Sequence, residues 1–256
     1  MPNRIFAHVP FPMLVDRLQT VVERRINPEV FFPGEVLDTL IPEELAAVAE
    51  TLAAAGLHCT FHAAFMDLNP GSVERLIREA TLHRINQVLD AAEILKPDVI
   101  VFHPGYDRWR YGESQDKWLA HSIESWSSVL RRVEGTGSIV AVENIFEEEP
   151  STLRTLLEEM DHPQFRHCFD VGHWNLFHTV GMDEWFAELG AFIAEAHIHD
   201  NFGARDDHLP LGEATIDFER FFALMARYAP DAAWTIEAHC PAALDRALVA
   251  LERYQS

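Results

Sequence analysis

The segment AFIAEAHIHDNFGARDDH, residues 191–208, decides which fold the sequence favours. It opens with an apolar run from Ala191 to Ala196, which predicts a buried strand, and Gly203 marks the loop that follows. Three imidazoles and three carboxylates lie between His197 and His208. Neutral imidazole and carboxylate oxygen are the usual protein ligands of zinc and manganese. A solvated, histidine-rich loop explains this segment equally well when it is taken alone.

The same kind of ending recurs on other apolar runs. Side-chain alternation places Val99, Val101 and His103 on one strand face, so that a small or apolar series ends in an ionisable residue. One such residue is weak evidence, because a lone histidine at a strand end is more often a hydrogen-bonded core or surface residue. Repetition favours a metal site, since a buried carboxylate or imidazole needs a partner and an ion supplies one. Six successive runs end in this way, at His62, His103, Glu143, Asp170, His197 and Glu237.

Short apolar runs alternate with longer amphipathic segments along the whole chain. This alternation predicts a single (β/α)8 TIM barrel over residues 1–256, with the chemistry at the strand ends. An open, doubly wound sheet is the alternative, but it favours a glycine-rich phosphate loop after the first strand, where this chain has Pro10-Phe11-Pro12. Ser72 is the expected N-cap of the long helix. The predicted strands are 5–9, 30–32, 58–62, 99–103, 138–143, 166–170, 192–199 and 234–237, and the predicted helices are 11–25, 42–55, 72–95, 115–133, 151–160, 182–189, 218–228 and 242–254.

Composition limits the classes of partner. The formal net charge of −21, from 41 acidic and 20 basic residues, opposes binding to a nucleic-acid backbone, although it leaves room for a local basic groove. No apolar run approaches the ~20 residues of a membrane span. The first residues, MPNRIF, lack the features of a secretory signal, and the three cysteines are odd in number and widely spaced. We therefore expect a cytoplasmic protein with reduced thiols, no membrane partner and DNA as an unfavoured partner.

Seven short motifs carry a resemblance that covers about residues 61–239. In chain order they are FHAAF (61–65), FHPG (102–105), VEN (142–144), FDVGH (169–173), HIHDN (197–201), DDHLPLGE (206–213) and IEAH (236–239). In this ordered set the chain resembles the xylose isomerase-like barrel superfamily, which includes endonuclease IV and the sugar and sugar-phosphate isomerases and epimerases. The resemblance implies the TIM-barrel fold and a divalent-metal centre.

Carried over residue by residue, the endonuclease IV pattern implies nine metal ligands. His62 and His103 resemble the ligands of one ion, with Glu143 bridging to a second. Asp170, His197 and Glu237 would complete the second site, and His173, Asp206 and His208 the third. The resemblance thus implies one to three ions, with Zn²⁺ favoured and Mn²⁺ or Co²⁺ as alternatives. The single-metal epimerases of the superfamily need only Glu143, Asp170, His197 and Glu237, and there the two glutamates are also the catalytic acid/base pair.

Departures from the endonuclease IV pattern put DNA binding in doubt and leave the metal ligands intact. The arginine- and tryptophan-containing loop with which those nucleases probe DNA is replaced by Pro33-Gly34-Glu35, and Ala214 stands in place of a glycine. The favoured function is therefore a metal-dependent isomerase or epimerase of a small sugar, sugar phosphate or polyol, which transfers a proton through a metal-stabilised enediolate. The alternative is a trinuclear zinc phosphodiesterase acting on abasic-site DNA or small phosphate esters. A barrel that binds metal or ligand without turnover is a third class.

One loop interleaves basic and aromatic side chains, at residues 106–111. It could stack sugars or bases, grip a phosphate or close as a lid, and it could equally cover the barrel rim or form a contact in a homo-oligomer. His199 shares a strand face with His197, so it could support the metal ligands or simply be a hydrogen-bonded histidine. The expected substrate contacts are Arg108, Trp109, Arg110, His199 and Arg205.

Overall fold

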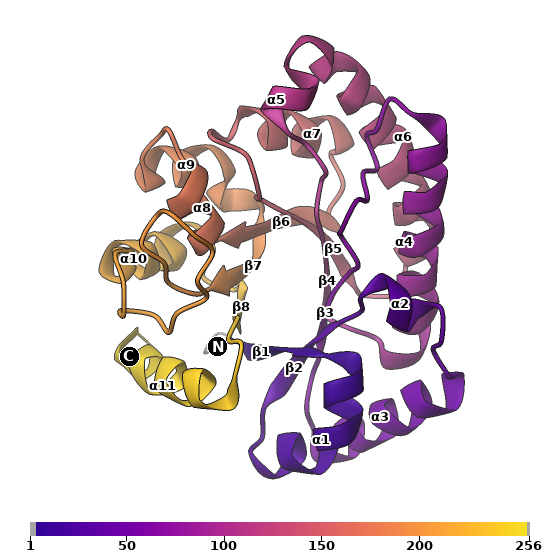
Figure 1. Cartoon of the computed structure of the whole chain (residues 1–256), viewed down its shortest axis with the longest axis vertical. Coiled ribbons are helices and arrows are strands. Elements are labelled where there is room, and N and C mark those ends of the chain that lie inside the picture. The colour runs from indigo at the N-terminus through magenta and orange to yellow at the C-terminus, as the bar shows by residue number, and fades with distance from the viewer. Residues whose placement is uncertain (1–3, 255–256) are drawn as a thin grey trace.

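Eight parallel strands close into a barrel in which each strand pairs with its neighbours in chain order, and β8 pairs with β1 (Figure 1). The computed structural model describes residues 4–254. The prediction of a (β/α)8 barrel is confirmed. The strands are β1 Ile5–Pro10, β2 Asn27–Phe31, β3 Thr60–His62, β4 Val99–Phe102, β5 Ile139–Glu143, β6 Phe165–Asp170, β7 Ile193–Ile198 and β8 Ala233–Ile236.

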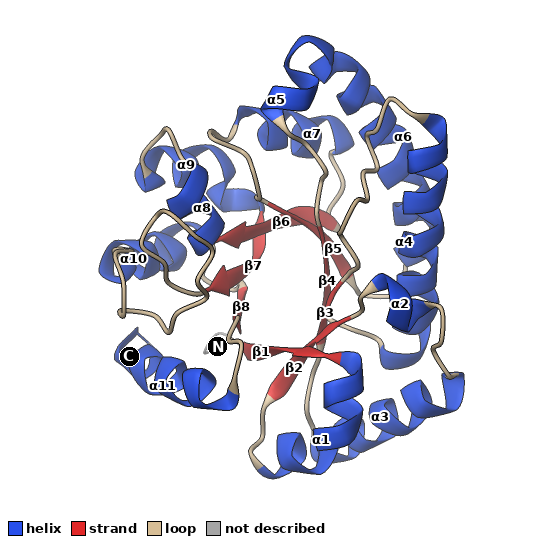
Figure 2. Ribbon diagram, in the orientation of Figure 1, coloured by secondary structure: helices blue, strands red, loops and turns tan. Residues whose placement is uncertain are grey.

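Helices surround the barrel and cover the outer face of the strands (Figure 2). Short helices α2, α5 and α8 are additions within the βα connections, beyond the helices that the sequence predicts. The helices are α1 Phe11–Glu23, α2 Gly34–Leu37, α3 Pro42–Ala55, α4 Arg75–Leu95, α5 Arg108–Tyr111, α6 Gln115–Val133, α7 Ser151–Met160, α8 Val171–Phe177, α9 Met182–Leu189, α10 Phe218–Tyr228 and α11 Pro241–Leu251, with 3₁₀ turns at Gly112–Ser114, Gly190–Phe192 and Glu252–Tyr254.

Several boundaries differ by one to three residues from the sequence-based expectation, and two of these differences have a clear physical cause. The N-cap of α4 is Glu74, whose carboxylate accepts a hydrogen bond from the Leu76 amide, whereas Ser72 accepts one from the Glu74 amide and so closes the preceding turn. Strand β2 begins at Asn27, three residues before the predicted start. Turn-forming residues such as Asn27 normally argue against a strand, but its side chain here donates to the Ile5 carbonyl at 3.1 Å and so joins β2 to β1.

The barrel interior follows the alternation expected from the sequence. Val99, Val101, Ala141 and Cys168 form a small apolar cluster of their own inside the barrel, separate from the main core between strands and helices. Nearer the carboxyl end, the next inward positions are polar and fully buried, and include Glu29. The interior therefore changes from apolar to ionisable toward the carboxyl ends of the strands, where TIM barrels carry their sites.

All three cysteines, Cys59, Cys168 and Cys240, are free thiols. Between residues 4 and 254, no helix has both the length and the apolar character that crossing a bilayer requires.

Candidate metal centre

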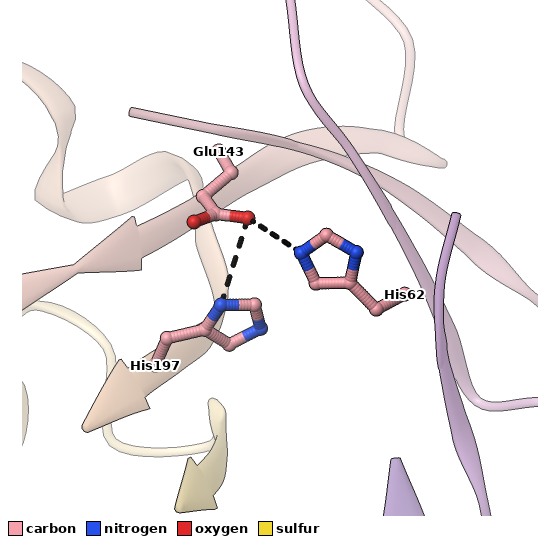
Figure 3. Close-up of side chains that lie close together, drawn as sticks. All are labelled: His62, Glu143 and His197. Carbon is pink, nitrogen blue, oxygen red and sulfur yellow. Dashed lines mark ion pairs between the residues drawn. The ribbon is translucent and has the colours of Figure 1, made fainter. Parts of the chain in front are cut away.

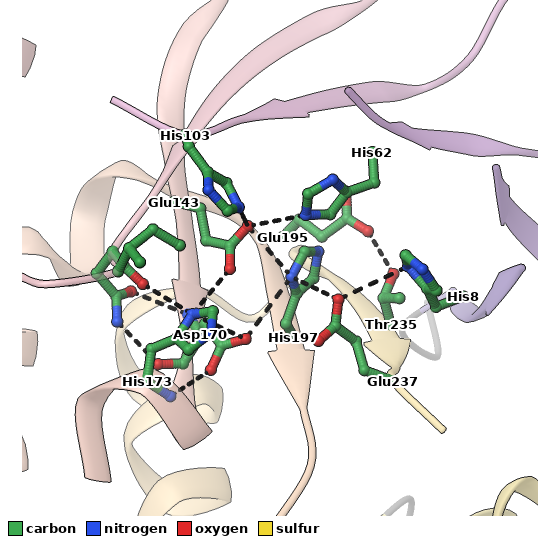
Figure 4. Close-up of polar contacts among 12 residues, drawn as sticks. His8, His62, His103, Glu143, Asp170, His173, Glu195, His197, Thr235 and Glu237 are labelled. Carbon is green, nitrogen blue, oxygen red and sulfur yellow. Dashed lines mark hydrogen bonds and ion pairs between the residues drawn. The ribbon is translucent and has the colours of Figure 1, made fainter. Parts of the chain in front are cut away.

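Six ionisable side chains meet at the carboxyl end of the barrel, one from each of β3 to β8 or from the residue that follows it (Figure 4). Their side chains are between 0% and 15% exposed, so water cannot solvate them fully. They lie at and below the floor of a cavity of about 1090 Å³. Four of them line this cavity, and Asp170 and His197 lie beneath it. The six are His62, His103, Glu143, Asp170, His197 and Glu237.

The first donor group surrounds Nδ1 of His197. This nitrogen lies 3.3 Å from Glu237 Oε1, 3.6 Å from Glu143 Oε2 and 3.8 Å from Asp170 Oδ2. Two ligands that sit 2.0–2.1 Å from one tetrahedral zinc ion are about 3.3 Å apart, so these separations suit a shared ion. Neither His197 Nδ1 nor Glu143 Oε2 has a hydrogen-bond partner among the described residues, although both are buried. Buried polar atoms without partners are rare, and a divalent ion is a partner that would satisfy donors of this kind.

The second donor group shares Glu143 with the first. His62 Nε2 lies 3.3 Å and His103 Nε2 3.4 Å from Glu143 Oε2, the oxygen that also faces His197 (Figure 3). Burial opposes a charge on His62, but the nearby carboxylate of Glu143 outweighs it and raises the pKa of His62 to about 9. Burial likewise opposes the charge on Glu143, but its interactions with His197 and then His103 keep the pKa of Glu143 well below its usual range. His62 would have to lose its proton before its Nε2 could bind an ion.

The third donor group lies nearer the mouth. Asp206 Oδ2 is 3.4 Å from His173 Nε2 and 3.0 Å from His208 Nε2, and His173 Nδ1 is 3.0 Å from Glu143 Oε1. Hydrogen bonds from the two histidines keep the pKa of Asp206 far below its usual range despite its partial burial. The structure thus brings together, in three adjacent groups, all nine side chains that the resemblance implies as metal ligands. Their role as metal ligands stays a prediction.

The far side of His197 is held by a residue that the sequence did not single out. Glu29 on β2 is fully buried, and its Oε1 lies 2.9 Å from His197 Nε2, while its Oε2 lies 2.9 Å from His8 Nδ1. With Nε2 directed at Glu29, Nδ1 is the nitrogen that faces Glu143, Asp170 and Glu237. A carboxylate in this position fixes the tautomer and ring orientation of a metal-binding histidine.

A second glutamate inside the barrel has a different state. Glu195 on β7 lies one inward position below His197, where Thr60 Oγ1 donates to its Oε1 at 3.2 Å and Thr235 donates to the same oxygen. Burial, followed by the negative charge of Glu29, raises the pKa of Glu195 to about 8. At pH 7 the neutral form of Glu195 is therefore favoured, whereas the pKa of Glu29 is lowered and its charged form is favoured.

The predicted substrate contacts fall at different depths. Arg110 lines the cavity, whereas the other four do not belong to its lining. Arg108 pairs with Glu148 at 2.9 Å, Trp109 is 84% exposed, and the Arg205 side chain is 86% exposed. His199 is buried, with Nε2 3.2 Å from both oxygens of Asp170. The proposed roles of these five residues in substrate binding stay predictions.

The position of His199 depends on one glycine. A Cβ at Gly172, in the first turn of α8, would lie 2.0 Å from Cε1 of the His199 ring. The same ring stacks on His208 with centroids 4.1 Å apart. His199 therefore links Asp170 of the first donor group to His208 of the third.

Comparison with known proteins places the chain in a family. A family model described as a xylose isomerase-like TIM barrel matches residues 28–254. The chain belongs to this family. The uncharacterized protein MJ1311 of Methanocaldococcus jannaschii is 29% identical over 189 residues, which cover 70% of this chain and 64% of that protein. The match thus spans less than two thirds of that relative's length.

Solved structures agree with the family assignment. A D-tagatose 3-epimerase-like protein superposes with a TM-score of 0.84 at 23% identity, covering 98% of this chain and 96% of that one. The TTHB071 protein from Thermus thermophilus, soaked with ZnCl2, gives a TM-score of 0.80 at 24% identity, covering 98% and 97%. Several sugar epimerases are further structural neighbours. At these identities the likeness establishes the fold.

Proposed function

We propose that this protein is a divalent-metal-dependent isomerase or epimerase of a small sugar, sugar phosphate or polyol. The observation that carries the proposal is the convergence of three carboxylates on the unpartnered Nδ1 of His197. The fold likeness to a D-tagatose 3-epimerase-like protein and the membership of the xylose isomerase-like family support the same class.

Glu143, Asp170, His197 and Glu237 would hold the ion, for which zinc, manganese and cobalt suit this mixed nitrogen and oxygen donor set. When bound, the ion would supply the positive charge that polarises two adjacent substrate oxygens. Its carboxylate ligands come from β5, β6 and the end of β8, so that donors from several strands surround the cavity floor. Glu29 would keep the imidazole of His197 oriented throughout.

Glu143 and Glu237 would move the proton. Both line the cavity, one at the end of β5 and the other directly after β8, and so approach a bound substrate from different sides. One carboxylate would take the proton from the carbon beside the substrate carbonyl. The other, in its protonated form, would return a proton to the opposite face of that carbon and so invert it. General acid–base catalysis of this kind contributes ~10²–10⁴-fold to the rate.

A second candidate function has its own support. The groups around Glu143 Oε2 and Asp206 bring further donors within 3.0–3.4 Å, which is the arrangement that a trinuclear phosphodiesterase requires. The net charge of −21 disfavours DNA as the substrate, and a small phosphate ester would avoid that conflict.

Three measurements distinguish the candidates. Protein purified without added metal and loaded with Mn²⁺ or Zn²⁺ is incubated with ketoses in D2O, and incorporation of deuterium at carbon is followed by NMR. We expect exchange and the appearance of the epimer or isomer. Elemental analysis of the purified protein and a nicking assay on abasic duplex DNA are run beside it. Three zinc ions per chain together with phosphodiester cleavage and no carbon exchange would reject the epimerase in favour of the hydrolase.

A further inference from the structure

The upper part of the cavity differs in chemistry from its floor. The first two donor groups occupy the floor and the third lies on one side above it, whereas the two remaining walls toward the mouth are largely apolar. One wall comes from the β3–α4 connection and the start of α4, and another from the β5–α7 connection and α8. The apolar side chains are Phe65, Met66, Leu68, Val73 and Ile77 on the first wall and Ile145, Phe146, Leu176 and Phe177 on the second.

Several of these wall residues are exposed, which is unusual for large apolar side chains. Met66 is 73%, Val73 52%, Phe146 51% and Ile77 41% exposed. Single exposed apolar residues need no explanation, but several gathered around one cavity mark a binding surface. Phe146 also packs edge-on against Phe177, with ring centroids 5.3 Å apart, so the second wall presents an aromatic surface.

The size of the cavity exceeds what a sugar at the floor would fill. At about 1090 Å³ it is slightly larger than the ~300–1,000 Å³ range that holds drug-sized molecules. A single sugar unit placed at the donors would leave the apolar walls in contact with water. The cavity therefore suits a longer molecule with a polar end and an apolar end.

The charges along the walls argue against a phosphate at the outer end. Arg110 is the one arginine or lysine among the lining residues that the structure describes. Asp67 and Asp107 line the same cavity, so its outer part carries no excess of positive charge from arginine and lysine. A doubly charged phosphate would find little compensation there, whereas an uncharged apolar group would bury the side chains of both walls.

We propose that the substrate is a sugar conjugate whose sugar part sits at the metal donors and whose attached aryl or alkyl group lies between the two apolar walls. This inference rests on the proposed function for the identity of the polar part. The apolar part is argued from the cavity alone. Removing each methylene from water contributes about fourfold to affinity, so a phenylalkyl group held between the walls strengthens binding by more than tenfold.

The test uses two hydroxamates, which present two adjacent oxygens to a divalent ion and differ only in their tails. Acetohydroxamate and 4-phenylbutanohydroxamate are titrated into the Mn²⁺-loaded protein by calorimetry. We expect the phenylalkyl compound to bind about 30-fold more tightly. Equal affinities within twofold would overturn the inference while leaving the metal centre and the proposed reaction in place. Conversely, a retained tail preference without deuterium exchange into any sugar would reject the proposed reaction and not the apolar subsite.

Matched variants locate the effect. Phe146→Ser and Val73→Ser should each reduce the advantage of the tail, by about tenfold and about threefold, and leave acetohydroxamate binding unchanged. Phe202→Ser and Val249→Ser are the controls, because these residues are 61% and 66% exposed and lie outside the cavity lining. We expect both controls to keep the full advantage. If instead sedimentation shows a dimer that Phe146→Ser dissociates, and the tail gives no advantage, the apolar mouth is an interface between copies and the inference is wrong.

Discussion

The two ends of the barrel use their charged residues in opposite ways. At the amino-terminal end a smaller cavity, of about 380 Å³, is lined by residues that include Arg4, Asp98 and Arg166. There the polar groups have partners, since Arg4 pairs with Asp98 and Arg166 donates to the Ala191 carbonyl at 2.6 Å. At the carboxyl end, buried atoms such as His197 Nδ1 have no hydrogen-bond partner among the described residues.

The polar residues at the amino end stabilise the fold, whereas those at the carboxyl end are arranged to bind something else. Ion pairs such as that at Arg4 are complete without any ligand. Donors that are buried, close together and unpartnered, such as Glu143 Oε2, are costly unless something else binds them. We therefore expect substitutions and metal ions to act strongly at the carboxyl end and weakly at the amino end.

The largest effect is expected from the two glutamates proposed to move protons. Glu143→Gln and Glu237→Gln should each lower the rate of deuterium exchange into the substrate by ~10²–10⁴-fold, because an amide can neither take nor return the proton. The rate is measured by NMR alongside the metal content of each variant. Near-normal exchange by both variants with metal bound would show that neither glutamate is the acid or the base.

Metal binding should stabilise the protein through the carboxyl end alone. With zinc or manganese at 100- to 1,000-fold above its Kd, the free energy of unfolding should rise by about 2.7–4.1 kcal/mol, measured by denaturant titration with and without EDTA. His197→Ala should abolish this gain. His58→Ala is the matched control, since His58 lies 3.1 Å from Asp98 at the other end and should leave the gain intact. Equal stabilisation of both variants would place the ion elsewhere.

Metal binding, followed by the same denaturant titration, should depend on pH in a defined direction. Burial lowers the pKa of His62, but Glu143 raises it to about 9, so the metal-free protein carries a proton on this imidazole at neutral pH. A metal ligand must lose its proton, and binding therefore releases it. Metal affinity of the group that contains His62 should increase as pH rises from 7 toward 9. His62→Gln should weaken that dependence without abolishing it, because the pKa values of His173 and His197 are raised as well.

A smaller effect is expected from removing the Glu29 carboxylate that orients His197. Glu29→Ala should weaken metal affinity by 10–100-fold, because the imidazole loses the acceptor that orients it, and Glu29→Gln should retain part of the affinity through its amide oxygen. Glu195→Gln is the control inside the same barrel. Its carboxyl group has a pKa of about 8 and is neutral at pH 7, so an amide should change metal affinity little. Metal affinity is measured by competition with a chromogenic chelator.

The ionisable residues at the strand ends could be predicted from the sequence, whereas the buried glutamates beneath them could not. His103 and Glu143 were found because they terminate apolar series of period two, and this pattern depends only on local sequence. The helices Pro42–Ala55 and Gln115–Val133 were predicted to the residue for a similar reason, since proline at a helix start and continuous amphipathic spacing are local signals.

Glu29 and Glu195 were missed because their partners are distant in sequence. Glu29 contacts a histidine 168 positions away, and Glu195 a threonine 135 positions away. The predicted second strand began at Val30, which left Glu29 outside it. One signal was available: Glu29 is two positions before Phe31, and so has the inward parity of a residue that lines the cavity. A buried carboxylate at that position would then have implied a hydrogen-bonding or oppositely charged partner.

The smallest effect is expected at the amino-terminal end. Arg4→Ala removes an ion pair whose side chains are 53% and 30% exposed, and pairs of this kind contribute at most about 1 kcal/mol to stability. Metal affinity and deuterium exchange should not change, because the pair lies at the end of the barrel away from the donors. Unfolding is followed by denaturant titration and metal affinity by chelator competition. A loss of metal affinity comparable to that of Glu29→Ala would mean that the two ends are coupled through the strands, and that compensated charges at the amino end help to hold the open donors in place.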